Sequence, residues 1–304
     1  MPIMGGLEAT AQIAGSSSVP VLIFTHNSDP DLPFKALERG AADFLLKPDY
    51  NDLNRPAYVR DFIARLKALA VRRPAPGPER LAARVSTRAA GAPDTPAPAA
   101  SAVRAPANAE SEPLPSALSM VVVGASTGGP QAVSLLLSGL KAPFPLPITL
   151  VQHIETGFDK SYADWLGEQS GHHVVLAQAG EEPAAGTVYV APTDKHLRFS
   201  GRLFVLDDGL KVQNQKPSVD VLFRSAAEHY GAKVLGILLT GMGSDGAEGC
   251  SAIRAAKGFT VVQDEASSLI FGMPRAAIAL GAASLVLGLD RIAPFVASLV
   301  GGAE

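Results

Sequence analysis

The stretch Met120-Val121-Val122-Val123-Gly124-Ala125-Ser126-Thr127-Gly128-Gly129 joins a short apolar run to a glycine-rich turn, and an apolar helical pattern starts at Gln131. Short apolar runs bounded by turn residues are typical of buried strands. Comparable runs, mostly separated by helical patterns, follow at residues 148–151, 187–190, 235–239, 260–262 and 285–287. This alternation predicts an α/β fold over residues 118–304, with a doubly wound, mainly parallel sheet. Residues 195–206 predict an antiparallel hairpin at one edge, turning at Ser200 and Gly201.

Two segments of different character precede this α/β segment. Residues 72–117 contain 9 Pro and 14 Ala but no aromatic residue, Ile or Met. They cannot bury enough apolar surface to offset the entropy of ordering, so we expect a disordered linker. Residues 1–71 predict two strands and three helices, at 6–14 (helix), 19–24 (strand), 32–39 (helix), 42–46 (strand) and 56–69 (helix). Two strands are too few for a stable sheet, which indicates a partial domain.

The turn around Ser126 admits three interpretations. Gly124-Ala125-Ser126-Thr127-Gly128 fits the G-x-S-x-G nucleophile elbow, in which small residues allow a tight strand-to-helix turn that exposes the serine hydroxyl. The amides of the following helix could instead hold a phosphate group, or the glycines could serve the geometry of the turn alone. A dinucleotide fingerprint would need glycine at Ser126, and a P-loop would need a lysine that this turn lacks. Both nucleotide motifs are therefore disfavoured.

A nucleophilic serine needs a base and a carboxylate that orients the base. Among six histidines, His153 follows the strand expected beside the Ser126 strand, which places it at the same sheet edge. His196 could be structural or could face a substrate. Asp245 lies in the glycine-rich loop after the most apolar strand and is the candidate carboxylate, although it could equally cap the next helix. We expect solvated surface positions for the remaining candidates near the sheet, which are His172, His173 and His229.

Length, charge and cysteine content narrow the class of protein. The 304 residues suffice for two domains, and a net charge of −3 argues against a nucleic-acid binder that relies on a basic surface. Cys250 is the single cysteine, which rules out intramolecular disulfides and disfavours a zinc cluster. No signal peptide, membrane-spanning apolar run or metal-ligand motif is recognisable. We therefore expect a cytoplasmic protein with no bound metal and no membrane insertion.

Several strings in residues 118–304 resemble the CheB family of chemotaxis protein-glutamate methylesterases. They include residues 123–130, 151–153, 191–196, 217–223, 239–246 and 271–274. The resemblance implies a catalytic triad of Ser126, His153 and Asp245, with backbone amides near Thr127 and Met242 as oxyanion donors. It also implies a serine hydrolase that needs no cofactor, demethylates γ-glutamyl methyl esters of chemoreceptors with release of methanol, and deamidates receptor glutamines. The alternatives are a non-catalytic phosphate- or nucleotide-binding regulator, and a serine hydrolase of another substrate.

Residues 1–71 resemble the second half of a response-regulator receiver domain with a flavodoxin-like fold. Residues 1–8 resemble the segment after the phosphorylated aspartate, Thr25 the switch hydroxyl residue, and Lys47-Pro48 the receiver Lys-Pro pair. No phosphoacceptor is present in this chain, so we expect the reading frame to continue upstream, with an aspartate three residues before Met1. The resemblance implies the chemotaxis histidine kinase as a second partner, beside the chemoreceptors.

Overall fold

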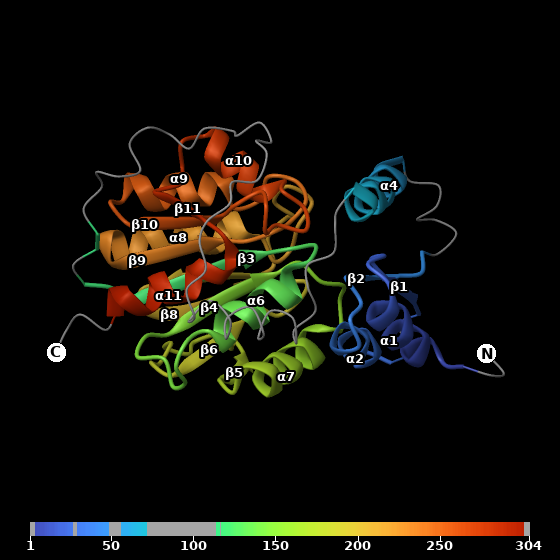
Figure 1. Ribbon diagram of the computed structural model, residues 1–304. Coiled ribbons are helices and arrows are strands. Elements are labelled where there is room, and N and C mark those ends of the chain that lie inside the picture. The colour runs from blue at the N-terminus through green and yellow to red at the C-terminus, as the bar shows by residue number, and fades with distance from the viewer. Residues whose placement is uncertain (1–3, 27–28, 49–55, 72–113, 116, 301–304) are drawn as a thin grey trace, which may run out of the picture.

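The computed structural model describes residues 4–26, 29–48, 56–71, 114–115 and 117–300, and its main feature is a seven-stranded parallel sheet (Figure 1). The order of the strands is β11-β10-β9-β3-β4-β6-β5, with every neighbouring pair parallel. The strands are β3 (Met120–Ala125), β4 (Ile148–Gln152), β5 (His173–Leu176), β6 (Thr187–Val190), β9 (Val234–Leu238), β10 (Phe259–Gln263) and β11 (Leu285–Leu287). The predicted doubly wound α/β fold is confirmed. The predicted linker falls almost wholly outside the described residues and stays a prediction.

Helices cover both faces of this sheet because successive side chains of a strand point to opposite faces. In β3, Val121 and Val123 belong to the core beneath one set of helices, whereas Met120 and Val122 belong to the core beneath the other. The helices are α6 (Gly129–Ser138), α7 (Asp159–Ser170) and α11 (Leu289–Val300) on the first face, and α8 (Val219–Tyr230), α9 (Ala247–Ala255) and α10 (Met273–Ala279) on the second, with a short 3-10 helix at Gly231–Lys233. Helices on both faces explain why all six residues of β3 are buried.

The antiparallel hairpin is present, but its predicted place at the edge of the large sheet is wrong. Strands β7 (His196–Ser200) and β8 (Leu203–Asp207) form a separate two-stranded sheet. Its apolar side chains Leu197, Phe199 and Phe204 are buried in the core beneath α8. Burial of this apolar face against the helix layer, rather than hydrogen bonding to an edge strand, therefore positions the hairpin.

The N-terminal segment, of which residues 6–26 and 29–46 are described, packs against the first face of the large sheet. It contains α1 (Gly6–Ser16), β1 (Leu22–Thr25), α2 (Leu32–Glu38) and β2 (Asp43–Leu46), and α4 (Pro56–Val71) follows it. Strands β1 and β2 pair in parallel. Phe34 stacks on Tyr162 and Trp165 of α7, with ring centroids 5.7 and 5.6 Å away. Gln131 Nε2 of α6 donates to the Ala41 carbonyl at 2.6 Å, so one apolar core is continuous across the contact.

No helix in the described part of the chain combines the length and the apolar composition needed to span a membrane.

Candidate active site

The strand order brings together the loops that the sequence singled out. Strand β3 lies between β4 and β9, and Gly124 is in register with Val151 on one side and with Leu238 on the other. Ser126 follows β3, His153 follows β4, and the loop that carries Asp245 follows β9. Because the carboxyl ends of parallel strands meet at one edge of a sheet, all three residues lie at the same edge.

The turn at Ser126 is tight, and two glycines make it possible. Gly128 has φ +73°, and a Cβ there would lie 2.6 Å from Leu269 Cβ. A Cβ on Gly241, in the loop after β9, would lie 2.8 Å from Ser126 Cβ and 2.1 Å from Met273 Sδ. The two loops therefore touch directly, and Ser126 is only 4% exposed.

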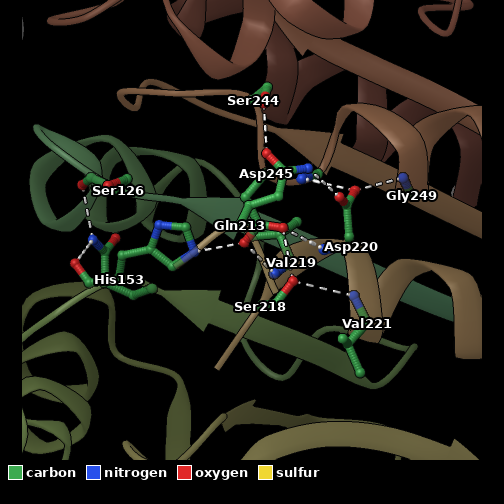
Figure 2. A network of polar contacts seen from close by, with 12 residues as sticks. Ser126, His153, Gln213, Ser218, Val219, Asp220, Val221, Ser244, Asp245 and Gly249 are labelled. Carbon is green, nitrogen blue, oxygen red and sulfur yellow. Dashed lines mark hydrogen bonds and ion pairs between the residues drawn. The ribbon is translucent and has the colours of Figure 1, made fainter. Parts of the chain in front are cut away.

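His153 and Asp245 form a buried pair. The His153 Nε2 and Asp245 Oδ2 atoms are 2.9 Å apart, and the two side chains are 6% and 3% exposed (Figure 2). Burial alone would raise the pKa of Asp245. The hydrogen bond and charge of His153, together with donors at Asp220 and Ser218, outweigh burial and hold the pKa below its usual value. Asp245 is therefore an anion suited to binding the N–H of an imidazole.

The ring of His153 presents its two nitrogens to opposite sides. Nε2 meets Asp245, whereas Nδ1 is buried without a hydrogen-bond partner and lies on the Ser126 side of the ring in Figure 2. In the Ser-His-Asp arrangement of chymotrypsin the carboxylate binds Nδ1–H and Nε2 is the base. In this structure Nε2 is the nitrogen that meets the carboxylate, so when Nε2 carries the proton that Asp245 accepts, Nδ1 keeps the lone pair.

Ser126 is linked to His153 through Gln152. The Gln152 Nε2 donates to the backbone carbonyl of Ser126 at 2.8 Å and to that of His153 at 3.1 Å. The structure thus pairs His153 with Asp245 directly and joins Ser126 to the pair through the backbone. Gln152 was assigned no role from the sequence, where a buried glutamine at a strand end gives no distinctive signal.

Backbone amides near Ser126 are available to a ligand. Ser126 N–H donates to the Thr240 carbonyl and Gly129 N–H to the Ser126 carbonyl. In the described part of the chain, the amides of Thr127 and Met242 donate to no protein atom. These two amides belong to the loops that meet at Ser126, which is where the sequence resemblance predicted oxyanion donors.

A cleft of about 260 Å³ opens onto Ser126 and His153. One wall comes from β2 and α4, with Asp43 and Arg65 among its residues, and another carries Lys211 and Lys216. Burial raises the pKa of Asp43 to about 6, although Arg65 and the backbone N–H groups of Phe44 and Gly128 favour its charged form. The N-terminal segment thus places a carboxyl group beside the turn that holds Ser126.

The side chains of the other histidines in the described part of the chain form no hydrogen bond with Ser126, His153 or Asp245, although His196 reaches Asp245 through Ser218. His172 was expected on the solvated surface, which is wrong, because its Nε2 binds the carbonyls of Leu137 and Leu140 at 3.1 and 3.3 Å. Carbonyls at a helix end lack partners within the helix, which explains this buried position. Both nitrogens of His196 are also engaged, with Ser218 N–H and the Leu210 carbonyl. His173 and His229 are exposed, as predicted.

No group of three or more His, Cys, Asp or Glu side chains that could hold a metal ion is found among the described residues.

Three residues around Asp245 escaped prediction, although they complete its surroundings. Ser218 Oγ donates to Asp245 Oδ1 at 2.7 Å, and the amides of Val219 and Asp220 donate at 2.8 and 3.0 Å. Asp245 therefore binds the N-terminus of α8 and does not cap its own helix, whose N-cap is Gly246. Ser218 is the N-cap of α8, and a serine before an apolar helical run is the signal that could have identified it.

Comparisons with known proteins agree with this geometry. Residues 121–296 match the family model of the CheB methylesterase. A protein-glutamate methylesterase/protein-glutamine glutaminase of Anaeromyxobacter dehalogenans is 39% identical over 96% of this chain and 79% of its own length. One from Cupriavidus metallidurans is 36% identical over 99% of this chain and 83% of its own length. The crystal structure of the Thermotoga maritima CheB methylesterase catalytic domain matches with a TM-score of 0.58 and 37% identity, over 60% of this chain and 99% of that domain.

The family and the esterase class predicted from the sequence motifs are thereby confirmed. A family match over more than half of the residues, together with relatives this similar over nearly the whole length, establishes that the chain belongs to the CheB methylesterase family.

Proposed function

We propose that this chain hydrolyses γ-glutamyl methyl esters of chemoreceptors, with Ser126 as nucleophile, His153 as base and Asp245 as the carboxylate that orients the imidazole. One observation carries the proposal. The buried pair of His153 Nε2 and Asp245 Oδ2, 2.9 Å apart, lies at the same sheet edge as the buried Ser126. A serine needs a base of this kind to become nucleophilic, and the names of the relatives support a glutamate ester as substrate.

The reaction proceeds through an acyl-enzyme. Ser126 Oγ attacks the ester carbonyl while its proton passes to His153 Nδ1, and the imidazolium is stabilised by Asp245. The tetrahedral intermediate collapses, the C–O bond to the methoxy group breaks, and the imidazolium protonates the departing oxygen to give methanol. Water, deprotonated by the same nitrogen, then attacks the acyl-enzyme. The acyl bond to Ser126 Oγ breaks, the imidazolium returns its proton to that oxygen, and the glutamic acid side chain leaves and ionises to the carboxylate.

The free amides of Thr127 and Met242 suit the charge that develops in this reaction. Both belong to loops in contact with Ser126, and neither is used within the described part of the chain. Amides fixed in advance around a developing oxyanion stabilise the transition state without reorganisation, and loss of one such donor costs about 100- to 1,000-fold in rate.

Deamidation of receptor glutamines follows the same route. The substrate carbonyl is then that of an amide, the C–N bond breaks, and His153 delivers its proton to nitrogen so that ammonia leaves. The relatives carry both activities in their names. The proposal needs no cofactor, and it places the protein in the cytoplasm with chemoreceptors as partners. The chemotaxis histidine kinase remains a predicted partner.

The decisive test measures methanol release from a methylated receptor by the full chain and its Ser126→Ala variant. We expect Ser126→Ala and His153→Gln each to lose nearly all activity, and their combination to lose little more, because the groups act as a unit. Ser138→Ala, at the opposite end of α6, is the control and should match the wild type. Near-normal activity of Ser126→Ala would end the proposed mechanism.

Labelling with a fluorophosphonate tests the non-catalytic alternative. An activated serine reacts with the probe, whereas a phosphate-binding turn does not. We expect labelling that is lost in Ser126→Ala and kept in Ser138→Ala. A folded wild-type protein that resists the probe would favour the phosphate-binding regulator.

A further inference from the structure

Beside the active site, the N-termini of α8 and α9 each donate backbone amides to an aspartate that belongs to the other segment. The first amides of α8, from Val219 and Asp220, donate to the carboxylate of Asp245, which precedes α9 (Figure 2). In return, Asp220 Oδ1 accepts the amides of Gly246 and Gly249 at the start of α9, at 2.9 and 2.7 Å. Asp220 therefore serves as the side-chain acceptor at the start of α9, while α8, which has its own N-cap Ser218, donates two further amides to Asp245.

The helix α9 depends on the Asp220 carboxylate because its own N-cap residue has no side chain. The N-cap is Gly246 at φ +93°, where a Cβ would lie 2.5 Å from a Leu238 methyl carbon. The first amides of a helix lack partners within the helix and are usually satisfied by an N-cap side chain. Asp220, which is fully buried, supplies that acceptor from α8.

The second carboxylate oxygen of Asp220 ties the same site to the loop before α8. Gln213 Nε2 donates to Asp220 Oδ2 at 2.7 Å, and Gln213 Oε1 accepts from the Ser244 hydroxyl at 2.5 Å. Ser244 is the residue before Asp245. The Asp220 carboxylate thus holds the Asp245 segment from both sides, through Gly246 N–H directly and through Gln213 and Ser244.

We propose that Asp220 is a positioning residue of the hydrolase: it fixes the backbone on both sides of Asp245, and so holds the carboxylate that orients His153. The inference rests on the proposed function of Asp245. Asp220 does not contact Ser126 or His153, and it acts only through Asp245. Loss of its acceptor frees the Gly246 peptide, which lets the Asp245 carboxylate rotate away from the His153 Nε2–H.

The geometry distinguishes the acceptor of Asp220 from its charge. Asn at this position keeps an Oδ1 acceptor for both α9 amides and gives up the negative charge. Its Nδ2 donor then faces Gln213, whose amide keeps the link to Ser244 by rotating, so that Oε1 accepts from Asn and Nε2 donates to the Ser244 hydroxyl oxygen. We expect Asp220→Asn to stay within about threefold of the wild-type kcat, and Asp220→Ala to lose about 10- to 100-fold in kcat with KM within about twofold. This result would show that kcat depends on the hydrogen-bond acceptor at position 220 and not on its negative charge.

A double-mutant cycle with Asp245→Ala tests whether Asp220 acts through Asp245. Its readouts are kcat and KM for methanol release, and the rate of fluorophosphonate labelling where turnover is slow. We expect Asp220→Ala to slow labelling about 10- to 100-fold in the wild type but less than about twofold in the Asp245→Ala background. An equal loss in both backgrounds, or a loss confined to KM, would overturn the inference.

Two further variants keep the test decisive. Asp264→Ala removes a carboxylate that also accepts a backbone amide, from Ser267 at 2.8 Å, and should leave kcat within about twofold. If Asp220→Ala does not fold, Asp220→Ser takes its place, because its short hydroxyl cannot serve both α9 amides. If Ser126→Ala abolishes activity but these Asp220 variants remain fully active, the positioning role fails while the proposed function stands.

Discussion

The buried carboxyl group of Asp43 makes the attachment of the N-terminal segment sensitive to pH. Asp43 is 5% exposed and lines the same cleft as Ser126. Burial raises its pKa from 3.8 to about 6. The folded protein therefore binds a proton at Asp43 more tightly than the unfolded chain, and the stability from this group must fall as pH rises from about 4 to 6.

The size of this effect follows from the two pKa values. The difference between 3.8 and about 6 corresponds to about 3 kcal/mol in full, at about 1.4 kcal/mol per tenfold change in the proton equilibrium. Between pH 5 and pH 7.5 the same two values give a loss of about 1 kcal/mol, because the unfolded chain is already mostly ionised at this position at pH 5 and only the interval from pH 5 to about 6 still contributes. The Asp43→Asn variant carries no ionisable group at this position and should lack this loss.

Trp165 provides the measurement. It is the only tryptophan of the chain and stacks on Phe34 of the N-terminal segment at 5.6 Å. Urea titrations followed by its fluorescence at pH 5 and 7.5 give the free energy of the transition in the wild type and in Asp43→Asn. Linkage applies whether the segment detaches alone or with the whole chain, because Asp43 becomes hydrated in both cases.

Comparing the wild type with Asp43→Asn cancels the pH dependence that groups other than Asp43 contribute to the free energy of unfolding. His153, Glu155 and Arg65 line the same cleft and are common to both. We expect the wild type to lose about 1 kcal/mol more than Asp43→Asn on going from pH 5 to 7.5. Equal losses in the two proteins would refute the reasoning.

Two other predictions concern the site and its domain. Gly241→Ala should lower both the melting temperature and kcat, because the added Cβ would lie 2.1 Å from Met273 Sδ and 2.8 Å from Ser126 Cβ; wild-type values in calorimetry and in the methanol assay would contradict this contact. A fragment of residues 118–304 should fold and hydrolyse ester alone, since Ser126, His153 and Asp245 all lie within it; circular dichroism of an unfolded fragment would place the domain boundary elsewhere.

Local sequence signals predicted the elements of the large sheet well. Apolar runs bounded by glycine gave strands β6 and β11 with their observed limits, and the other predicted strands to within a residue or two. Strand β5, which begins at the exposed His173, was missed. Its residues Val174, Val175 and Leu176 form an apolar run as long as that of β11, so the run itself was present and only the polar pair His172-His173 before it favoured a surface segment.

The sequence by itself determined the α/β class and the family, and it predicted Ser126, His153 and Asp245 as the site residues, because short motifs and periodic apolar runs are local properties of the chain. Only the tertiary structure decided which ring nitrogen of His153 meets Asp245, and which groups hold that carboxylate. The hydrogen bonds between the N-termini of α8 and α9 and the two aspartates join residues about 25 positions apart, at Asp220 and Asp245. Contacts of this kind depend on how two helices pack, so no pattern within either helix could have revealed them.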